Sequence, residues 1–344
     1  MGQDRIGIGI VGLGVGQWHL EEFQKVPEAE VVALCDLDES KLMDAGRKYG
    51  VSRLYTDYRE LVEDPRVDAV SICLPNYLHA PAAIAALEAG KHVLVEKPLA
   101  RTPEEAREIV AARDRSGKKA MVAMKFRFLP EAAYIRRLWE EGKFGEVYYG
   151  FNSYIRPVGK GIPRAWFYRR ELSGGGALID NGVHLLDITW YLMGCPKPVE
   201  AFGATYAEFG PKGKGGVPPE DAGAFDVDDF ACGMVRFEGG ASVLIENGWA
   251  AHIDRGVIAA RIFGTEGGAS VWPFYIVRER EGESSAEVPD IAGFSFPSQF
   301  QHFVDCVLED RETFSPLEDG VVVLEMLTAL YRSAEEGRSV PVCG

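Results

Sequence analysis

A lysine follows the apolar run from His92 to Val95, in the sequence HVLVEKP of residues 92–98. Such a β-branched run predicts a strand of a parallel sheet, and the strand ends at Pro98 because proline cannot donate to the next ladder. Open α/β sheets bind ligands at the carboxyl edge of their strands. Lys97 is therefore a candidate for contact with a ligand, although a surface lysine at a strand end would give the same pattern.

A carboxylate and an imidazole follow a run of three glycines at residues 174–176. Asp180 and His184 are four residues apart and Asp187 is three further on, so a helix would place them on one face. A carboxylate beside an imidazole orients the ring and raises its basicity, as a general base for an alcohol proton requires. We expect Asp180 and His184 to be catalytic and Asp187 to be a structural hydrogen-bonding residue. An N-cap role for Asp180, or a metal site of all three side chains, are the alternatives; we expect no metal.

A glycine-rich turn, GLGVG at residues 12–16, follows an apolar run at 6–11 and precedes a segment with helical spacing. Glycines in this position let the backbone approach a pyrophosphate, whose charge the helix N-terminus stabilises. The dinucleotide pattern GxGxxG would need glycine where Gln17 stands, and Gly16 comes one residue early. The residues expected to bind the cofactor here are Gly12, Gly14, Val15 and Gly16.

An aspartate ends the second expected strand. Asp36 stands 24 residues after Gly12, and its carboxylate can accept both ribose hydroxyls of NAD while it would repel the 2′-phosphate of NADP. The next residues are Leu37 and Asp38, with no arginine beside them. This favours NAD over NADP. The alternative is that Asp36 only caps the helix that begins near Asp38.

Two parts of the sequence, with different patterns of strands and helices, must position these groups. Strands and helices alternate in the first third, which implies a doubly wound parallel sheet. The strands are expected at 6–11, 30–35, 67–74, 92–95 and 120–124, and the helices at 17–26, 38–49, 76–89 and 103–116. After residue 145 strands are expected at 146–154, 199–207, 229–237, 241–250, 256–263 and 268–272, and helices at 181–193, 297–308 and 317–335. Turns at 238–240 and 266–268 indicate antiparallel hairpins.

The predicted fold class is therefore an α/β Rossmann domain over residues 1–125, followed by an α+β domain with a large, mostly antiparallel open sheet over residues 126–344. Helices on one face of that sheet would leave the other face for a partner subunit, so we expect a homodimer or homotetramer formed through the C-terminal sheet. The glycine-rich stretch at 209–223 predicts a lid-like loop.

Bulk composition narrows the class of protein. The chain has 344 residues, enough for two domains, with 47% hydrophobic and 26% charged residues. A formal charge of −15 excludes broad attraction to nucleic acid or anionic membrane. The first residues lead directly into a strand, so no signal peptide is expected. Six widely spaced cysteines without a CxxC pair indicate reduced thiols, and the expected location is cytoplasmic.

These features together resemble the Gfo/Idh/MocA family of sugar and inositol dehydrogenases along nearly the whole chain. The resemblance rests on the glycine turn and on segments 75–79 (PNYLH), 89–98 (AGKHVLVEKP), 127–130 (RFLP), 174–187 and 303–306 (FVDC). It implies that Lys97 contacts both substrate and nicotinamide, and that Asp180 and His184 are the substrate-side pair. It also implies that segment 75–79 lines the nicotinamide. The cofactor residues added in this way are Pro75, Asn76, His79, Glu96 and Lys97.

The substrate side is less defined by the sequence. The resemblance points to Arg127, although Lys125 stands where many relatives have asparagine. Trp166 begins an aromatic run before two arginines, and aromatic faces can stack on sugar C–H surfaces, while arginines can hold a carboxylate or phosphate. Ordinary packing with solvated charge is the alternative. The substrate-binding residues we expect are Lys97, Arg127, Trp166, Asp180 and His184.

The expected function is oxidation of a secondary alcohol on a sugar, inositol or related polyol to a ketone, with hydride transfer to the nicotinamide of NAD. Two alternatives remain open. One is an NAD-dependent glycosidase that uses transient oxidation and elimination, which net formation of NADH would distinguish. The other is a non-catalytic sensor of sugar and dinucleotide. The expected partners are a small sugar or polyol and further copies of the chain, with no nucleic acid and no membrane.

Overall fold

The computed structural model describes residues 5–159, 161–163, 165–280 and 282–342. The chain divides into two compact units, the first made of Met1–Ala123 and Pro297–Val321 and the second of Met124–Phe296 and Val322–Gly344. The chain first passes from one unit to the other between Ala123 and Met124, close to the expected boundary after residue 125. The segment Pro297–Val321 differs from the expectation, because it packs with the first unit and not with the second.

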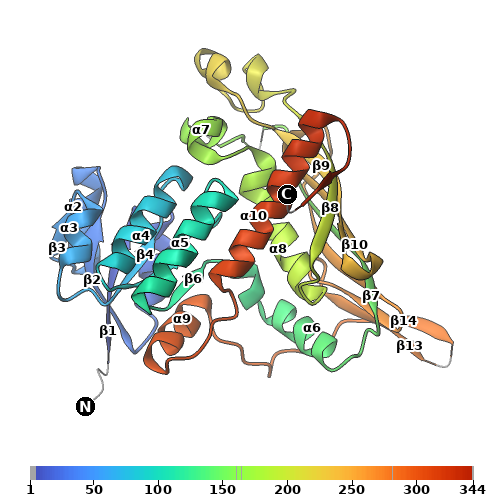
Figure 1. The fold of residues 1–344 in the computed structure, drawn as a ribbon, viewed down its shortest axis with the longest axis horizontal. Helices are drawn as coiled ribbons and strands as arrows, with labels where there is room; N and C mark the ends of the chain where they lie inside the picture. Colours follow the sequence, from blue (N-terminus) through green and yellow to red (C-terminus); the bar gives the residue numbers. More distant parts are fainter. Residues whose placement is uncertain (1–4, 160, 164, 281, 343–344) are drawn as a thin grey trace. The chain divides into compact units, whose positions relative to one another are not determined.

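The first unit contains, among its described residues, six parallel strands in the order β3-β2-β1-β4-β5-β6. The strands are β1 (Ile6–Val11), β2 (Ala29–Cys35), β3 (Arg53–Tyr55), β4 (Ala69–Ile72), β5 (His92–Val95) and β6 (Ala120–Val122). The helices are α1 (Gly16–Phe23), α2 (Glu39–Tyr49), α3 (Tyr58–Glu63), α4 (His79–Glu88), α5 (Pro103–Ser116) and α9 (Gln299–Leu308), and α4 lies beside α5 (Figure 1). The strand order reverses between β1 and β4, and ligands of open α/β sheets bind at such a switch point.

Capping residues set the bounds of several helices in this unit. The Thr102 hydroxyl accepts a hydrogen bond from the Glu105 backbone nitrogen at 3.2 Å, and Pro103 occupies the first turn of α5. The same helix ends at Gly117, whose φ of 63° is the left-handed conformation that glycine adopts at little cost. The start and end of α5 thus agree with the expected helix.

The returning segment completes the first unit through aromatic contacts. The ring of Phe300 on α9 packs edge-on against Phe23 and Trp18 of α1, with ring centroids 4.9 and 5.2 Å apart. Beyond α9, the Ser315 hydroxyl donates to the Val122 carbonyl of β6 at 2.8 Å. These buried contacts explain why the segment belongs to the first unit.

The second unit has a nine-stranded sheet among its described residues, in the order β14-β13-β12-β11-β7-β10-β9-β8-β15. Its strands are β7 (Val147–Pro157), β8 (Pro198–Tyr206), β9 (Phe230–Phe237), β10 (Ser242–Ala251), β11 (Val257–Gly264), β12 (Gly267–Ser270), β13 (Tyr275–Arg280), β14 (Glu283–Glu287) and β15 (Val340–Pro341). Its helices are α6 (Pro130–Glu140), α7 (Arg170–Ser173), α8 (Val183–Leu192) and α10 (Leu317–Glu336), whose first turns belong to the first unit. Neighbouring strands are antiparallel except β7 and β10, which are parallel.

Glycines on one face of this sheet let α8 and α10 approach closely. A Cβ atom added to Gly203 or Gly233 would lie 2.6 Å from atoms of Leu330 on α10. A Cβ atom added to Gly150 would lie 2.8 Å from the Thr189 methyl group on α8. The helices can therefore rest directly on the strands, and the core of the unit forms between them.

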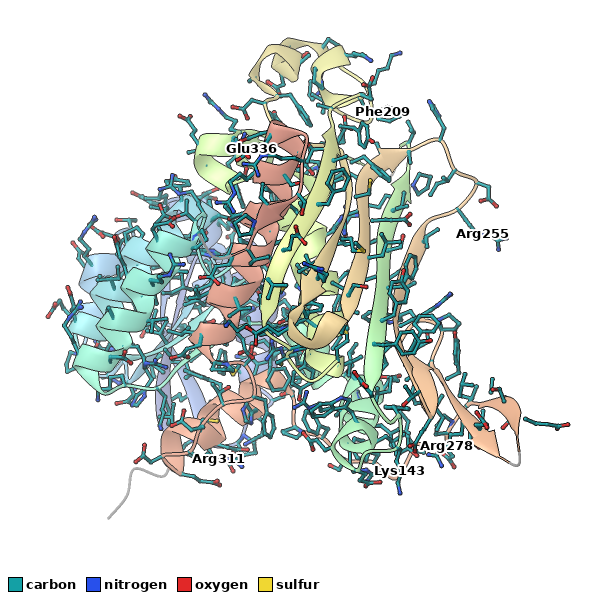
Figure 2. The ribbon with its side chains drawn as sticks, turned by 45° about the vertical axis from the view of Figure 1, so that its right-hand side comes forward. Lys143, Phe209, Arg255, Arg278, Arg311 and Glu336 are labelled. Carbon is teal, nitrogen blue, oxygen red and sulfur yellow. The ribbon has the colours of Figure 1, made fainter. Side chains whose placement is uncertain are left out.

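The opposite face of the sheet carries exposed apolar side chains. Phe202, Met234 and Phe263 are 52%, 42% and 39% exposed. Phe202 and Met234 are directly paired across β8 and β9. Figure 2 shows the strands with their side chains, with Phe209 near one end of the sheet and Lys143 and Arg278 near the other.

The two architectures confirm the predicted fold class of a parallel Rossmann sheet followed by a mostly antiparallel sheet domain. In the described part of the chain, no helix is both long and apolar enough to cross a membrane. The cysteines of that part are free thiols, and Cys343 lies outside it.

Candidate active site

The glycine turn of the first unit has the form of a dinucleotide cradle. Gly12 has a φ of +88° and lies so close to β4 that an added Cβ atom would be 2.5 Å from the Cys73 carbonyl oxygen. No atom lies within 4 Å of a Cβ atom added to Gly14, so this position is open to a ligand. Gly16 begins α1 and packs on β1, since its Cβ atom would lie 3.0 Å from Ile10. Gly16 thus provides the close helix–strand contact, which explains why Gln17 is tolerated.

The nucleotide-selecting aspartate is tied to the same turn. The Asp36 carboxylate accepts a hydrogen bond from the Leu13 backbone nitrogen at 2.7 Å and from the Asp38 backbone nitrogen at 3.0 Å. The Asp38 side chain, and not Asp36, caps α2 through the Lys41 backbone nitrogen at 3.1 Å. Asp36 is therefore fixed beside the turn with its carboxylate at the end of β2. The open Gly14, the N-terminus of α1 and this carboxylate fit the pyrophosphate and ribose of NAD.

A buried ion pair holds the segment that carries Lys97. The Nε2 atom of His19 on α1 lies 2.9 Å from a Glu96 carboxylate oxygen, and its Nδ1 atom lies 2.8 Å from the Ser71 hydroxyl of β4. The other Glu96 oxygen accepts from the Lys97 backbone nitrogen at 3.1 Å. Glu96, expected at the cofactor, is therefore a buried support that links α1, β4 and the lysine.

Burial lowers the pKa of His19, but the neighbouring Cys73 sulfur and the Glu96 carboxylate outweigh it and raise the pKa to about 10. Burial raises the pKa of Glu96, while the hydrogen bond and charge of His19 bring it below its ordinary value. Both shifts favour an imidazolium–carboxylate pair. The charged ring can donate to Glu96 and Ser71 at the same time.

The segment after β4 supports the lysine from the other side. Asn76 is buried in the short 3₁₀ turn Asn76–Leu78 that follows Pro75. The two ring nitrogens of His79 each lie 2.7 Å from a carbonyl oxygen, one of Pro98 and one of Leu74. Burial lowers the pKa of His79 despite these carbonyl groups. His79 thus joins this segment to Pro98, and its contact with the cofactor stays a prediction.

In the second unit a buried aspartate anchors the glycine run. The Asp228 carboxylate accepts hydrogen bonds from the Gly176 and Leu178 backbone nitrogens at 2.8 and 2.9 Å, and from the Tyr331 hydroxyl at 2.6 Å. A Cβ atom added to Gly176 would lie 1.9 Å from the Asp228 carbonyl oxygen, so only glycine fits. Burial raises the pKa of Asp228, although these hydrogen bonds oppose the shift.

The candidate general base lies where a π-helical turn meets an α-helix. Leu178–Gly182 form the π turn and α8 follows directly, so Asp180 lies in the turn and His184 in the first turn of α8. Such π turns often mark functional sites. The indole nitrogen of Trp249 on β10 donates to the Asp180 carboxylate at 2.9 Å. The two predicted residues therefore belong to one local element, which Trp249 holds from the sheet.

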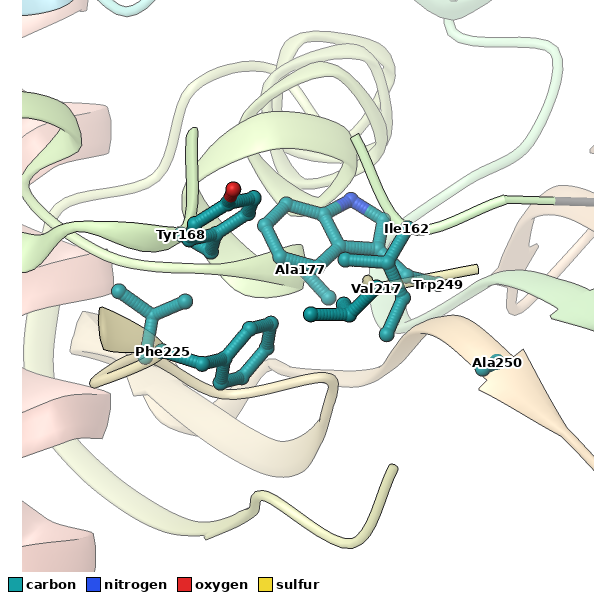
Figure 3. Packing of buried hydrophobic residues seen from close by; sticks show 8 residues of the cluster. Ile162, Tyr168, Ala177, Val217, Phe225, Trp249 and Ala250 are labelled. Carbon is teal, nitrogen blue, oxygen red and sulfur yellow. The ribbon is translucent and has the colours of Figure 1, made fainter. Parts of the chain in front are cut away.

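Trp249 is itself buried in an apolar cluster, shown in Figure 3. The cluster consists of Ile162, Tyr168, Ala177, Val217, Phe225, Val227, Trp249 and Ala250, with Phe167 and Phe209 packed against it. Val217, and Phe209 at its edge, come from the stretch 209–223 that was expected to form a lid-like loop. The Asp229 carboxylate fixes the start of this stretch by accepting from the Phe209 and Gly210 backbone nitrogens at 2.6 and 3.0 Å. The stretch is thus anchored beside the residue that holds Asp180.

Aromatic rings surround His184. The Phe126 ring lies 4.9 Å from the imidazole between centroids, and Trp272 packs against Phe126 at 4.8 Å. Only 8% of His184 is exposed. The imidazole is therefore largely shielded from water, which strengthens its interaction with a neighbouring charge.

Arg127 does not lie open to a substrate. It is 1% exposed and is paired with Asp187, which is equally buried, through nitrogen–oxygen distances of 2.5 to 3.1 Å. Its guanidinium also lies over the Tyr191 ring at 4.6 Å. The structural role expected for Asp187 agrees with this pairing, which removes it from the metal alternative. Arg127 becomes a buried support of α8.

Trp166 keeps a partly exposed face. Its ring is stacked on Phe167 with centroids 4.0 Å apart, and Phe167 packs on the cluster around Trp249. The arginines after this run are paired with acids: Arg169 with Glu171 at 3.4 Å, and Arg170 with Glu335. Trp166 is thus connected through Phe167 to the cluster around Trp249, which holds Asp180. The two arginines, in contrast, are each paired with a glutamate.

Four supporting residues were missed by sequence reasoning. His19, Asp228 and Trp249 are far in sequence from the groups they hold, and no local spacing connects them. Arg156 near the end of β7 donates to the Asn181 side-chain oxygen at 3.3 Å, next to Asp180. Only Trp249 and Arg156 lie within strands, where an aromatic or charged residue was an available signal.

Comparison with known proteins agrees with this geometry. Residues 6–124 match the family described as "Oxidoreductase family, NAD-binding Rossmann fold", and residues 132–270 match the "GFO/IDH/MocA C-terminal domain". D-Glucoside 3-dehydrogenase of Escherichia coli (strain K12) is 29% identical over 343 residues, which cover 97% of this chain and 96% of that protein. A putative UDP-kanosamine synthase oxidoreductase subunit of Amycolatopsis mediterranei (strain S699) is 32% identical over 270 residues, 76% of this chain and 74% of that protein.

A solved structure extends the likeness to the whole fold. Levoglucosan dehydrogenase in complex with NADH and levoglucosan has a TM-score of 0.87 and 25% identity, covering 99% of this chain and 100% of that one. The first unit is an NAD-binding Rossmann domain, and the protein is an NAD(P)-dependent oxidoreductase whose relatives are dehydrogenases. With both halves matched, the chain belongs to the Gfo/Idh/MocA family of oxidoreductases.

Proposed function

We propose that this protein oxidises a secondary alcohol of a sugar or cyclic polyol to a ketone, with NAD as the hydride acceptor. The observation that carries the proposal is the Asp180–His184 element, whose carboxylate is held by Trp249 at 2.9 Å and whose imidazole is shielded by Phe126. The substrates named for the relatives, a glucoside and levoglucosan among them, support a carbohydrate.

The chain's own residues supply the acid–base part of the reaction. His184 accepts the hydroxyl proton as the alcohol is oxidised, and Asp180 stabilises the imidazolium that forms. Lys97 is proposed to stabilise the developing alkoxide by charge and hydrogen bond, with Glu96 and His79 fixing its segment. Bound NAD supplies the oxidising power, and the open Gly14 and the Asp36 carboxylate are the residues that would hold it.

The experiment is a screen of sugars and polyols with NAD, in which net formation of NADH is followed by absorbance. Lys97→Ala is the matched variant, and it should lower turnover by roughly 10²–10³-fold while NAD binding is kept. The Lys91→Ala variant is the control, because Lys91 donates only to the backbone carbonyls of Asp64 and Val67. Turnover of Lys97→Ala above half the wild-type rate would remove Lys97 from the mechanism.

Two other functions remain as outcomes of the same screen. A glycosidase that oxidises transiently would release sugar from a glycoside without net NADH. A sensor would bind sugar and NAD without turnover of any kind. The retained Asp180–His184 element speaks against a sensor, which needs no general base.

We also propose that the protein is cytoplasmic and assembles into a homodimer or homotetramer through the exposed face of its C-terminal sheet. Phe202, Met234 and Phe263 expose apolar side chains on this face, and exposed apolar patches often mark interaction sites. Light scattering should therefore give a mass of at least twice 37.8 kDa, and Met234→Glu should lower it. A wild-type mass equal to that of one chain would contradict the proposed assembly.

A further inference from the structure

A partly buried guanidinium contacts the residue that follows Asp180 in the π turn. Arg156 is near the end of β7, half-buried, and its Nη2 atom donates to the Asn181 side-chain oxygen and the Tyr154 hydroxyl, both at 3.3 Å. Asn181 follows Asp180 directly within the π turn. The guanidinium is therefore bound to the residue that follows Asp180, the carboxylate proposed to assist His184.

The partners of Arg156 are all neutral. Its guanidinium also lies over the Tyr154 ring, 5.1 Å from the centroid. Among the described residues no carboxylate forms an ion pair with it, and Nε and Nη1 have no hydrogen-bond acceptor. In contrast, Arg127, Arg169 and Arg170 of the same unit each have an acidic partner. Arg156 thus contacts the π turn without a direct acidic partner among the described residues, although Asp180 belongs to the same turn.

The neighbouring turn has a further donor without an acceptor. The side-chain nitrogen of Asn181 is buried and has no hydrogen-bond partner among the described residues, while its oxygen is taken by Arg156. Buried donors normally find an acceptor, because leaving one unsatisfied costs free energy. The excess of donors at this point indicates a ligand that brings acceptor oxygens.

We propose that the substrate of this protein carries an anionic group, a carboxylate or a phosphate, and that Arg156 binds it. The inference rests on the proposed function, because it names the class of sugar taken by the same site. With Nη2 engaged by Asn181 and Tyr154, Nε and Nη1 of Arg156 can each donate a separate charge-assisted hydrogen bond to an anionic oxygen. With a formal charge of −15, the protein gives an anion no general attraction, so recognition depends on a local cation such as Arg156.

The test compares matched pairs of acidic and neutral sugars. D-Glucuronate is compared with D-glucose, and D-galacturonate with D-galactose, while D-glucose 6-phosphate tests a phosphate as the source of charge. Formation of NADH gives kcat/KM for each sugar. The wild-type protein should favour the carboxylate or the phosphate member by roughly 10- to 100-fold. A preference for neutral sugars would overturn the inference while leaving the proposed function intact.

Two substitutions separate substrate binding from support of the turn. Arg156→Gln should lower kcat/KM for the acidic sugar far more than for the neutral sugar, mainly through a higher KM for the acidic one. Arg156→Lys, which keeps the charge but has one nitrogen donor where arginine has three, should restore part of the preference. Arg170→Gln is the control, because Arg170 is already paired with Glu335. Equal losses for acidic and neutral sugars in Arg156→Gln would show a merely structural role and overturn the inference.

Calorimetry of D-glucuronate binding, in the presence of NAD, covers the case in which no sugar is oxidised. Binding to the wild-type protein that is lost in Arg156→Gln would support the anion site although the proposed function had failed. Equal binding by both proteins, or none by either, would overturn the inference.

Discussion

Replacement of Trp249 by phenylalanine tests how the general base is held. The substitution removes the indole nitrogen that donates to Asp180 at 2.9 Å and leaves an aromatic ring in the cluster of Figure 3. A hydrogen bond to a charged group contributes about 1.5–3 kcal/mol. Because each 1.36 kcal/mol changes a rate tenfold, we expect kcat/KM to fall by roughly 10- to 150-fold.

A matched substitution controls for the smaller ring. Trp190 on α8 is also buried, and its indole nitrogen donates to the Pro196 carbonyl at 2.8 Å. Trp190→Phe therefore loses the same group without touching Asp180. Both variants should lose thermal stability, but only Trp249→Phe should lose activity and change the acid limb of the kcat/KM profile. Activities of the two variants within twofold of each other would refute the role of Trp249.

The remaining predictions concern three other groups. Asp187→Asn should lower the free energy of unfolding by about 3–5 kcal/mol, because it leaves the buried Arg127 charge unpaired; chemical denaturation measures this, and a loss below 1 kcal/mol would contradict it. His19→Gln should cost a similar amount near pH 7. Because the pKa of His19 is raised, its contribution to the free energy of unfolding is fully present below about pH 6.5 and is lost as the pH rises through about 10. The stability difference between the wild-type protein and His19→Gln should therefore shrink at high pH. A constant difference between pH 7 and 10 would show that the charge of His19 does not matter. Asp36→Ser combined with Leu37→Arg should move cofactor preference toward NADP, and kinetics with both cofactors decide it; equal use of NADP by the wild-type protein would remove Asp36 from that role.

Local patterns were sufficient for the elements that local interactions define. The strand at His92–Val95, the helix at Pro103–Ser116 with its Thr102 cap, and the hairpins around 238–240 and 266–268 lie close to where the sequence predicts them. Short or polar elements were missed, among them β3, α3 and the β13–β14 hairpin, and so was the 11-residue helix α6. The strand β14 has the sequence ESSAE, whose exposed residues carry no alternating apolar signal.

The residues of the candidate site likewise fall into those that local sequence patterns predicted and those that they did not. Sequence spacing identified Asp180, His184 and the glycine turn, because each belongs to one local segment. The partners that hold them come from distant segments, as Trp249 and Asp228 do, and only the register of the sheet brings them together. Substrate binding by Arg127 stays a prediction, and its sequence context gave no sign that it is buried and paired with Asp187.

The return of Pro297–Val321 to the first unit has a consequence for biosynthesis. A ribosome makes the parallel sheet first, yet α9, which covers α1 with Phe300, is made only after strands β7 to β14 of the second sheet. Until then Phe23 lacks the neighbour that shields it in the finished protein. The nascent nucleotide-binding half must therefore wait, partly uncovered, for most of the chain. A fragment that ends near residue 125 would remain in that condition permanently, and its exposed aromatic surface would favour aggregation over the native fold.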